Sequence, residues 1–397
     1  MLTIDNVYRA QNALKGVARK TDVIYAPKLC EGVELYLKTE NLQVTGSFKV
    51  RGAYYKMSRL TAEEKAKGVV ACSAGNHAQG VALAARENGI KAVICLPDGA
   101  PISKVEATKS YGAEVCLVEG VYDDAYNRAL SLRDEEGYTF LHPFNDEDVI
   151  AGQGTIALEL AEQLPDLDAV IVPIGGGGLI SGIAYTIKTV NPRVKVYGVE
   201  ASGAASMKNA ISKEKIEELA SVSTIADGIA VKKPGELTYE LCKKYVDEIV
   251  TVSDDEISAA ILALMEKHKL VTEGAGAVAV AAAMFGKIDI QGKKAVCVLS
   301  GGNIDVTILS RVIDRGLLMA GRSCHLTLEL VDKPGQLQSV SEIIARLGGN
   351  VTEVHHERAS AGSDVNGCFL RMSLETRNFE HITQIKNALR AAGFKLV

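Results

Sequence analysis

The sequence predicts an α/β protein with two lobes built on parallel sheets, followed by a smaller C-terminal domain in which the elements follow the order β-α-β-β-α-β. Short apolar runs of strand length alternate with helical stretches from about residue 68 to residue 299, and glycine-rich turns follow several of these runs. Alternating strands and helices are typical of parallel sheets with crossover connections. The pattern changes after Arg315, which separates the C-terminal domain.

The two lobes are expected within residues 1–320, with a small lobe of about residues 46–145 inserted in the large lobe. A helix over 5–18 and a half-exposed strand over 34–38 come first, and a polar stretch, 41–47, leads into a helix that begins near Phe48. Buried strands are then expected at residues 69–72, 92–96, 114–118, 138–142, 169–174, 195–200 and 295–299. Helices are expected to end at residues 86 and 190 and to span 103–111, 122–135, 152–164, 254–267 and 275–285. This arrangement favours a ligand at the carboxyl ends of the strands, between the lobes.

The C-terminal domain is expected over residues 325–397, after a connector at 316–324. Its strands are expected at 325–330, 351–358, 367–375 and 394–397, its helices at 336–347 and 379–392, and a polar loop at 359–366. This order is the ferredoxin-like one.

Composition excludes several classes of protein. The net charge of −5 and the lack of any Lys/Arg run argue against nucleic-acid binding. The N-terminus has no apolar signal segment, and the longest small-apolar stretch, 275–285, is too short to span a bilayer. None of the eight cysteines forms a C-x-x-C pair. We therefore expect a cytoplasmic protein with buried free thiols and no membrane or nucleic-acid partner.

The first chemical motif is the run from Gly46 to Ala53, in which Lys49 follows a Gly-Ser turn at the start of a helix. The positive end of the helix disfavours the ammonium form of that lysine. A lysine held as a neutral amine is suited to form a Schiff base.

The second motif is the strand-to-helix turn Ser73-Ala74-Gly75-Asn76-His77. Backbone N–H groups at such a turn bind a carboxylate, and the alternative interpretation is an ordinary capped helix start.

The third motif is Gly175-Gly176-Gly177-Gly178-Leu179, between an apolar strand and a helix. Successive glycines allow a backbone to approach a phosphate closely. A dinucleotide site is the rival interpretation, but the G-x-G-x-x-G spacing is broken at Ile180 or at Ser181, depending on the starting glycine. The fourth motif, Ser300-Gly301-Gly302-Asn303, follows the strand at 295–299 and directs a serine towards the same cleft.

Together the strings S-F-K-x-R-G-A, S-A-G-N-H-A-Q-G, G-G-G-G-L and S-G-G-N resemble the fold-type-II pyridoxal-phosphate enzymes, and closely their threonine dehydratase branch, over about residues 5–320. The resemblance implies that Lys49 holds pyridoxal phosphate, that Phe48 lies beside its ring and that Asn76 binds the ring hydroxyl. It further implies that Ser300 faces the ring nitrogen and that the substrate carboxylate binds at Ser73, Ala74, Gly75, Asn76 and His77. The phosphate contacts would be Gly175, Gly176, Gly177, Gly178 and Leu179.

The implied activity is that of a lyase: β-elimination of water from L-threonine, giving 2-oxobutanoate and ammonia, in isoleucine biosynthesis or threonine catabolism. L-Serine is the expected second substrate. The freed Lys49 amine would take the Cα proton. No carboxylate appears in the motifs to protonate the leaving hydroxide, so the cofactor phosphate is the candidate acid.

The segment Leu330-Val331-Asp332-Lys333-Pro334-Gly335-Gln336-Leu337 resembles the ACT family of amino-acid sensors. This resemblance implies allosteric regulation by a small molecule, with Gly335, Gln336 and Asn350 as contacts. Isoleucine is the natural candidate, and valine, serine and a nucleotide are the alternatives. It also implies a homo-oligomer, either a dimer or a tetramer. The alternative is a domain that only assembles subunits.

Serine racemase, a related serine dehydratase and a catalytically silent sensor that binds the cofactor are the alternative functions. Racemisation needs an acid that the racemases place at the position of Ala74, and alanine has none. The racemase metal site would map to Glu200, Ala204 and Ser206, and its last position is normally Asp. His355 and His356 are adjacent on a strand and should face opposite sides. No metal site is therefore expected.

Overall fold

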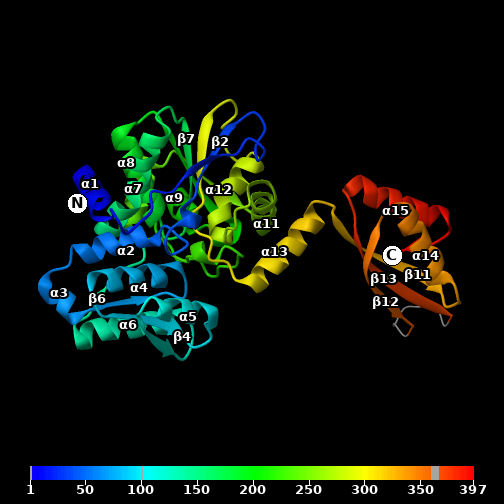
Figure 1. The fold of residues 1–397 in the computed structure, drawn as a ribbon, viewed down its shortest axis with the longest axis horizontal. Coiled ribbons are helices and arrows are strands. Elements are labelled where there is room, and N and C mark those ends of the chain that lie inside the picture. The colour runs from blue at the N-terminus through cyan, green and yellow to red at the C-terminus, as the bar shows by residue number, and fades with distance from the viewer. Residues whose placement is uncertain (1, 101, 359–365) are drawn as a thin grey trace. The chain divides into compact units, whose positions relative to one another are not determined.

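The computed structural model describes residues 2–100, 102–358 and 366–397. The chain divides into two compact units, an N-terminal unit, Met1–Ile308, and a C-terminal unit, Leu309–Val397. The two parallel sheets predicted for the lobes both lie in the N-terminal unit (Figure 1). Apart from Asn366, the polar loop predicted at 359–366 falls outside the described residues.

The small lobe is a four-stranded sheet in the order β5-β4-β3-β6, with every neighbouring pair parallel. Its strands are β3 (Val69–Cys72), β4 (Ala92–Pro97), β5 (Glu114–Val118) and β6 (Thr139–Phe140), and its helices include α2 (Lys49–Ser58), α3 (Ala62–Lys67), α4 (Asn76–Asn88), α5 (Ile102–Ser110) and α6 (Tyr122–Glu136). Short, wholly apolar strands such as β3 are buried on both faces, as parallel strands covered by helices must be.

The large lobe is a six-stranded sheet in the order β1-β2-β10-β7-β8-β9. Its strands are β1 (Val23–Tyr25), β2 (Glu34–Lys38), β7 (Ala169–Pro173), β8 (Lys195–Ala201), β9 (Glu248–Val252) and β10 (Lys294–Val298). All pairs are parallel except β1 with β2. Because β2 precedes and β7 follows the strands of the small sheet, the small lobe is an insertion in the chain of the large lobe.

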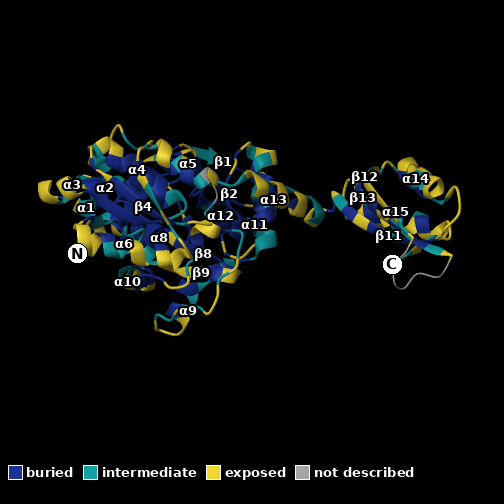
Figure 2. Cartoon of the chain, turned by 90° about the horizontal axis from the view of Figure 1, so that it is seen from below, coloured by how far each residue is buried: buried dark blue, intermediate teal, exposed yellow. Residues whose placement is uncertain are grey.

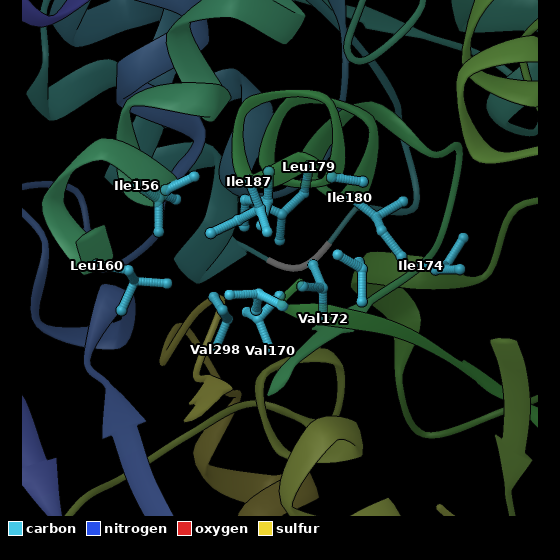
Figure 3. Packing of buried hydrophobic residues seen from close by; sticks show 14 of the residues in the cluster. Ile156, Leu160, Val170, Val172, Ile174, Leu179, Ile180, Ile187 and Val298 are labelled. Carbon is cyan, nitrogen blue, oxygen red and sulfur yellow. The ribbon is translucent and has the colours of Figure 1, made fainter. Parts of the chain in front are cut away.

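Apolar side chains of the large sheet pack against the helices on one of its faces. The helices of the large lobe are α1 (Ile4–Ala13), α7 (Glu147–Gln163), α8 (Gly178–Val190), α9 (Ser206–Ser212), α10 (Glu236–Tyr245), α11 (Asp254–Ala263) and α12 (Gly274–Met284). Figure 3 shows residues of β7, β10, α7 and α8 meeting in one cluster: Ile156, Leu160, Val170, Val172, Leu179, Ile180, Ile187 and Val298. Figure 2 shows the buried residues concentrated in the interior of the unit. This core fixes the start of α8 at the carboxyl end of β7.

The C-terminal unit has the predicted β-α-β-β-α-β order. Its elements are β11 (Ser323–Val331), α14 (Gln336–Arg346), β12 (Asn350–Glu357), β13 (Gly367–Glu375), α15 (Phe379–Ala391) and β14 (Lys395–Leu396). The antiparallel sheet has the order β12-β13-β11-β14. Alternate residues of β11 and β13, including Leu328 and Leu370, pack with Val340, Ile344 and Ile385 of the helices.

Several predicted bounds were wrong. The expected connector at 316–324 overlaps the end of a helix, α13 (Val306–Met319), and β11 begins at Ser323. The helix expected from 152 starts earlier, because the Asp146 carboxylate accepts N–H bonds from Asp148 and Val149 and caps α7. The elements β1, α3, α9, α10 and β9 were not predicted, since they are short or carry many polar residues.

No helix within the described residues is both long enough and apolar enough to cross a membrane. All eight cysteines lie within these residues and are free thiols.

Candidate active site

A cavity of about 340 Å³ lies where β3, β7 and β10 end. Its wall includes Cys72 and Pro173, the last residues of β3 and β7, and Ser300, just beyond β10. Every residue predicted to contact the cofactor or the substrate lines this one cavity: Phe48, Lys49, Ser73, Ala74, Gly75, Asn76, His77, Gly175, Gly176, Gly177, Gly178, Leu179 and Ser300. Four motifs that are distant in sequence thus meet in space.

Helices α2, α4, α8 and α12 all begin at the cavity wall. Their first or N-cap residues, which line the cavity, are Lys49, Gly75, Gly177 and Glu273. Within the described part of the chain, none of these helix starts has a side-chain cap. The first N–H groups of a helix have no partner inside it, and the helix end carries partial positive charge. The cavity therefore offers several places where an anion can bind.

The tetraglycine turn has no space for side chains. A Cβ atom at Gly176 would overlap the ring of Phe144, and one at Gly175 would come within 2.9 Å of the Ile229 Cα. Gly177 has a φ of 94°, in the left-handed region that favours glycine. The turn therefore presents bare backbone to the cavity, as close approach to a phosphate requires.

Lys49 has few polar partners for its amine. Its Nζ donates to the Pro143 carbonyl at 3.0 Å and lies 5.3 Å from the centre of the Phe48 ring. Burial lowers the pKa of Lys49 to about 8, and the Glu273 carboxylate partly opposes this shift. Burial, and not only the helix end named from the sequence, therefore favours the neutral amine. Compared with an ordinary lysine, the neutral fraction at pH 7 is about 300-fold larger.

A chain of amides and a carboxyl group orients Asn76. The Asn76 Nδ2 donates to Glu273 Oε1 at 2.6 Å, and its Oδ1 accepts from Asn303 Nδ2 at 2.8 Å. Burial, together with the nearby Asp227, raises the pKa of Glu273 to about 8. Glu273 is therefore mostly protonated at neutral pH, and one N–H of the Asn76 amide remains for a ligand.

The turn before α4 is held from both ends. Ser73 Oγ accepts the Gly75 N–H at 3.1 Å. His77 Nε2 lies 3.0 Å from the Leu141 carbonyl oxygen, and burial, with a smaller effect from Lys49, lowers its pKa to about 3. His77 is thus neutral and fixes the turn, while Ala74 presents only a methyl group.

Ser300 is tied to the lysine segment. Its Oγ donates to the Ala275 carbonyl at 3.2 Å, and its own carbonyl accepts the Phe48 N–H at 3.1 Å. An isolated bridge joins Ser47 to Gly301. The serine and the lysine are therefore held in register across the cavity.

The sequence motifs missed several residues of the wall. Four residues line the cavity but were not among the predicted site residues: Lys104, Phe144, Asp227 and Glu273. Lys104 of α5 pairs with Asp227 at 2.7 Å and so joins the small lobe to the large one. No local pattern marks these residues, because each reaches the site through the fold.

The three positions to which a racemase-type metal site would map lie between the end of β8 and the start of α9: Glu200, Ala204 and Ser206. Glu200 accepts N–H bonds from Met207 and Lys208, each at 2.8 Å, and burial raises its pKa to about 7. Ala204 is buried, and the buried Ser206 Oγ has no hydrogen-bond partner among the described residues. Glu200 therefore caps the start of α9.

The structure separates the residues predicted to bind an effector. Gly335 precedes α14, just beyond the end of β11, and Gln336 begins that helix. Asn350 opens β12 opposite Glu375, at the other end of β13, and its Nδ2 donates to Glu375 Oε2 at 2.7 Å. The length of β13 puts these ends about 26 Å apart. Gly335 and Gln336 therefore lie at one end of the sheet and Asn350 at the other.

Comparisons with known proteins agree with the geometry of the cavity. The family described as pyridoxal-phosphate dependent enzyme matches residues 14–301. The chain is 49% identical over 398 residues to the L-threonine ammonia-lyase of Thermotoga maritima, with 100% of this chain and 99% of that protein covered.

Two solved structures share the fold of the N-terminal unit. The processed form of threonine deaminase isoform 2 from Solanum lycopersicum has a TM-score of 0.76 and 40% identity, and the match covers 79% of this chain and 88% of that one. Maize serine racemase has a TM-score of 0.75 and 36% identity, with 80% and 98% covered.

The cavity itself fits the cofactor of this family. Bare backbone at the start of α8 suits a phosphate, a lysine with a lowered pKa suits an aldehyde, and an unused amide N–H suits a ring hydroxyl. The chain belongs to the family of pyridoxal-phosphate-dependent enzymes.

Proposed function

We propose that this protein is a threonine ammonia-lyase, which removes water and then ammonia from L-threonine to give 2-oxobutanoate, and that L-serine is a second substrate. The observation that carries the proposal is that Lys49, with its lowered pKa, shares one cavity with the tetraglycine turn. Relatives that match nearly the whole chain are named L-threonine ammonia-lyase.

We assign the cofactor contacts as follows. Gly175 to Leu179, at the start of α8, would hold the phosphate, Asn76 would bind the ring hydroxyl, and Ser300 would face the ring nitrogen, since all of them line the cavity. Phe48 would lie beside the ring and Lys49 would hold the aldehyde. Pyridoxal phosphate supplies the electron sink that stabilises negative charge at the substrate Cα. A serine hydroxyl at the ring nitrogen would not stabilise a protonated ring, whereas a carboxylate would.

The substrate is bound by the turn from Ser73 to His77, where the uncapped start of α4 receives its carboxylate. Once the amino group of the substrate has taken its place at the aldehyde, the freed Lys49 amine would remove the Cα proton, for which its neutral form is required. Glu273 is mostly protonated at neutral pH and so does not act as a base towards the substrate. It acts as a positioning residue, because its hydrogen bond orients the Asn76 amide.

Replacing Lys49 with Ala tests the proposal. We expect no measurable 2-oxobutanoate from L-threonine and loss of the visible absorbance of the covalently bound cofactor. Lys67→Ala on α3, at an exposed lysine, is the control and should retain both. Turnover by the Lys49→Ala variant close to that of the unchanged enzyme would refute the assignment. Absorbance of the unchanged protein without turnover of any amino acid would instead favour a silent sensor.

Serine racemase is the second candidate, because maize serine racemase shares the fold. Ala74, on the wall of the cavity, argues against it, since a methyl group has no proton to give to the second face of the substrate. We expect no D-serine from L-serine on a chiral column. An Ala74→Ser variant that forms D-serine would show that this position separates the two reactions.

We further propose that residues 325–397 are an ACT-type regulatory domain that binds an amino acid, with isoleucine as the first candidate. Gly335 and Gln336 are the proposed contacts in one copy. Asn350 takes part only if a second copy supplies it, which fits a homodimer or homotetramer. Calorimetric titration with isoleucine, valine and serine, alongside the mass of the complex in solution, tests this. An effector that binds a monomer would exclude the shared site.

We expect the enzyme in the cytoplasm, because a reducing compartment suits its free thiols.

A further inference from the structure

The C-terminal unit brings together three different metal-ligating side chains. Asp332 follows β11, His356 lies near the end of β12, and Cys368 is the second residue of β13. Their carboxylate oxygen, imidazole nitrogen and thiol sulfur all lie within 4.8 Å of one another. Cys368 is buried, whereas the other two residues are exposed at the end of the sheet.

The register of the sheet builds this cluster. Strand β13 pairs with β11 on one side and with β12 on the other, so that Cys368 stands opposite Leu330 and Leu370 opposite His356. Alternate residues of a strand face the same side. His356 therefore lies on the helix-covered face with Cys368 and Leu370, while His355 lies on the opposite face beside Arg371.

We propose that Asp332, His356 and Cys368 form a binding site for a divalent transition-metal ion of the zinc class. Thiolate, imidazole and carboxylate are the ligands zinc takes, and three protein ligands leave a fourth tetrahedral position for water. Ligand atoms around a tetrahedral zinc ion are about 3.5 Å apart, so the side chains must close by about 1 Å. The exposed Asp332 and His356 have room for this movement.

The present partners of these residues are weak competitors. Arg358 pairs with Asp332 at 3.1 Å, but the arginine side chain is 70% exposed, and such surface pairs contribute little. Binding of the ion requires the thiolate and so releases the Cys368 proton to solvent, and affinity should therefore increase with pH.

The site lies where the loop after β11 meets the neighbouring ends of β12 and β13, and the Asp332 N–H already donates to the Asn366 carbonyl at 2.9 Å. Asp332 opens the loop that ends at Gly335, before α14, and the other two ligands fix the ends of β12 and β13 that flank residues 358–366. A bound ion would hold this loop to the sheet three residues from a proposed effector contact. The inference does not depend on the proposed catalytic activity.

Zinc titration of the full-length holoenzyme tests the site, after treatment with EDTA and dialysis. In competition with a chromophoric chelator, we expect one zinc ion per chain at this site. His356→Ala and Cys368→Ser should each weaken binding about 100-fold or more, as loss of a first ligand exceeds that of an outer-shell partner. His355→Ala is the matched control, because it removes the adjacent imidazole from the other face, and it should leave the affinity unchanged.

Cobalt(II) gives a second readout. A tetrahedral cobalt–thiolate site absorbs in the red, where the cofactor does not, and this band should disappear in Cys368→Ser but persist in Cys324→Ser. Asp332→Asn, at an exposed position, should weaken binding without unfolding the unit and so covers the case in which Cys368→Ser fails to fold. The absence of zinc binding, or equal binding by the His356→Ala, Asp332→Asn and His355→Ala variants, would overturn the proposal.

Discussion

The helices that begin at the cavity differ from five helices that begin elsewhere in the chain. At α1, α3, α7, α11 and α15 a side chain of Thr3, Thr61, Asp146, Ser253 or Asn378 accepts a backbone N–H of the first turn. Within the described residues, α2, α4, α8 and α12 have no such cap. The N-cap residues of α10 and α14, which begin away from the cavity, likewise provide no side-chain cap. A cap stabilises a helix by about 1 kcal/mol. The cavity helices forgo this contribution, which leaves their N–H groups for ligands.

An uncapped helix must be fixed by other contacts, and α2 shows how. Two residues after Lys49, the buried Arg51 donates to both carboxylate oxygens of Glu40 and to Glu159 at 2.6–3.0 Å. Lys38 completes the cluster with a 2.6 Å bond to Glu159. Burial alone would lower the pKa of Arg51, but these carboxylates raise it above its usual value. One basic residue of α2 is thus fully paired for stability, while Lys49 is left nearly unpaired for chemistry.

The largest expected effect comes from removing the anchor of α2. Arg51→Met leaves two buried carboxylates with Lys38 as their one remaining cation, and loss of one partner of a buried ion pair costs about 3–5 kcal/mol. Urea denaturation of the holoenzyme should show this loss. Arg86→Met, which breaks the exposed pair with Glu87, is the control and should change little. An unchanged denaturation midpoint in Arg51→Met would show that packing alone holds α2.

The next effect concerns the bare start of α8. In Gly176→Ala the new methyl group overlaps the Phe144 ring, and overpacking costs about 1–3 kcal/mol. If the displaced turn no longer fits the phosphate, the cofactor should bind about 10- to 100-fold more weakly in an equilibrium fluorescence titration. Gly99→Ala adds a methyl group in open space and should bind normally. Normal binding by Gly176→Ala would separate the turn from phosphate recognition.

A side-chain cap added to α4 should stabilise the protein and weaken the binding of L-threonine. Gly75 has open space at its Cβ position, so Gly75→Asp can cap the first turn. We expect a gain of about 0.5–1 kcal/mol in stability, together with a KM for L-threonine about tenfold higher, because the new carboxylate occupies the substrate's donors. Ser253→Ala removes a cap from α11 and should lower stability by about 1 kcal/mol at unchanged KM. An unchanged KM in Gly75→Asp would show that the uncapped N–H groups of α4 do not bind the substrate.

The smallest effect is a shift in pH dependence. With the pKa of Lys49 at about 8, the rate of cofactor capture by the apoenzyme should rise about tenfold from pH 6 to pH 7 and level off above pH 8. The pKa of Glu273 is also about 8, so Glu273 ionises over the same pH range, and its charged form raises the pKa of Lys49. Glu273→Gln removes that charge and should move this midpoint to lower pH, by roughly a few tenths of a unit. Stopped-flow absorbance measures both profiles. A shift to higher pH would contradict the assigned direction.

The sequence was most informative where a motif is local. A strand, a glycine turn and a helix start occupy fewer than about ten residues, and each of the four motifs identified in this way lines the cavity. The role of Glu273 could not be predicted from the sequence, because its partner Asn76 is 197 residues away. Phe144, whose ring excludes side chains from the glycine turn, lies in a segment without periodicity. The separation of Gly335 from Asn350 could not be predicted either, since strand order, which brings distant residues together or apart, does not follow from any one motif.

The four uncapped helix ends also have a consequence over longer distances. The chain as a whole is acidic, with a formal net charge of −5, yet the partial positive charges of these ends converge on one recess. A phosphorylated or carboxylated molecule diffusing nearby would be repelled by much of the surface and drawn towards the recess. Added salt screens both interactions, so the salt dependence of the encounter rate between apoenzyme and cofactor shows which of the two is stronger.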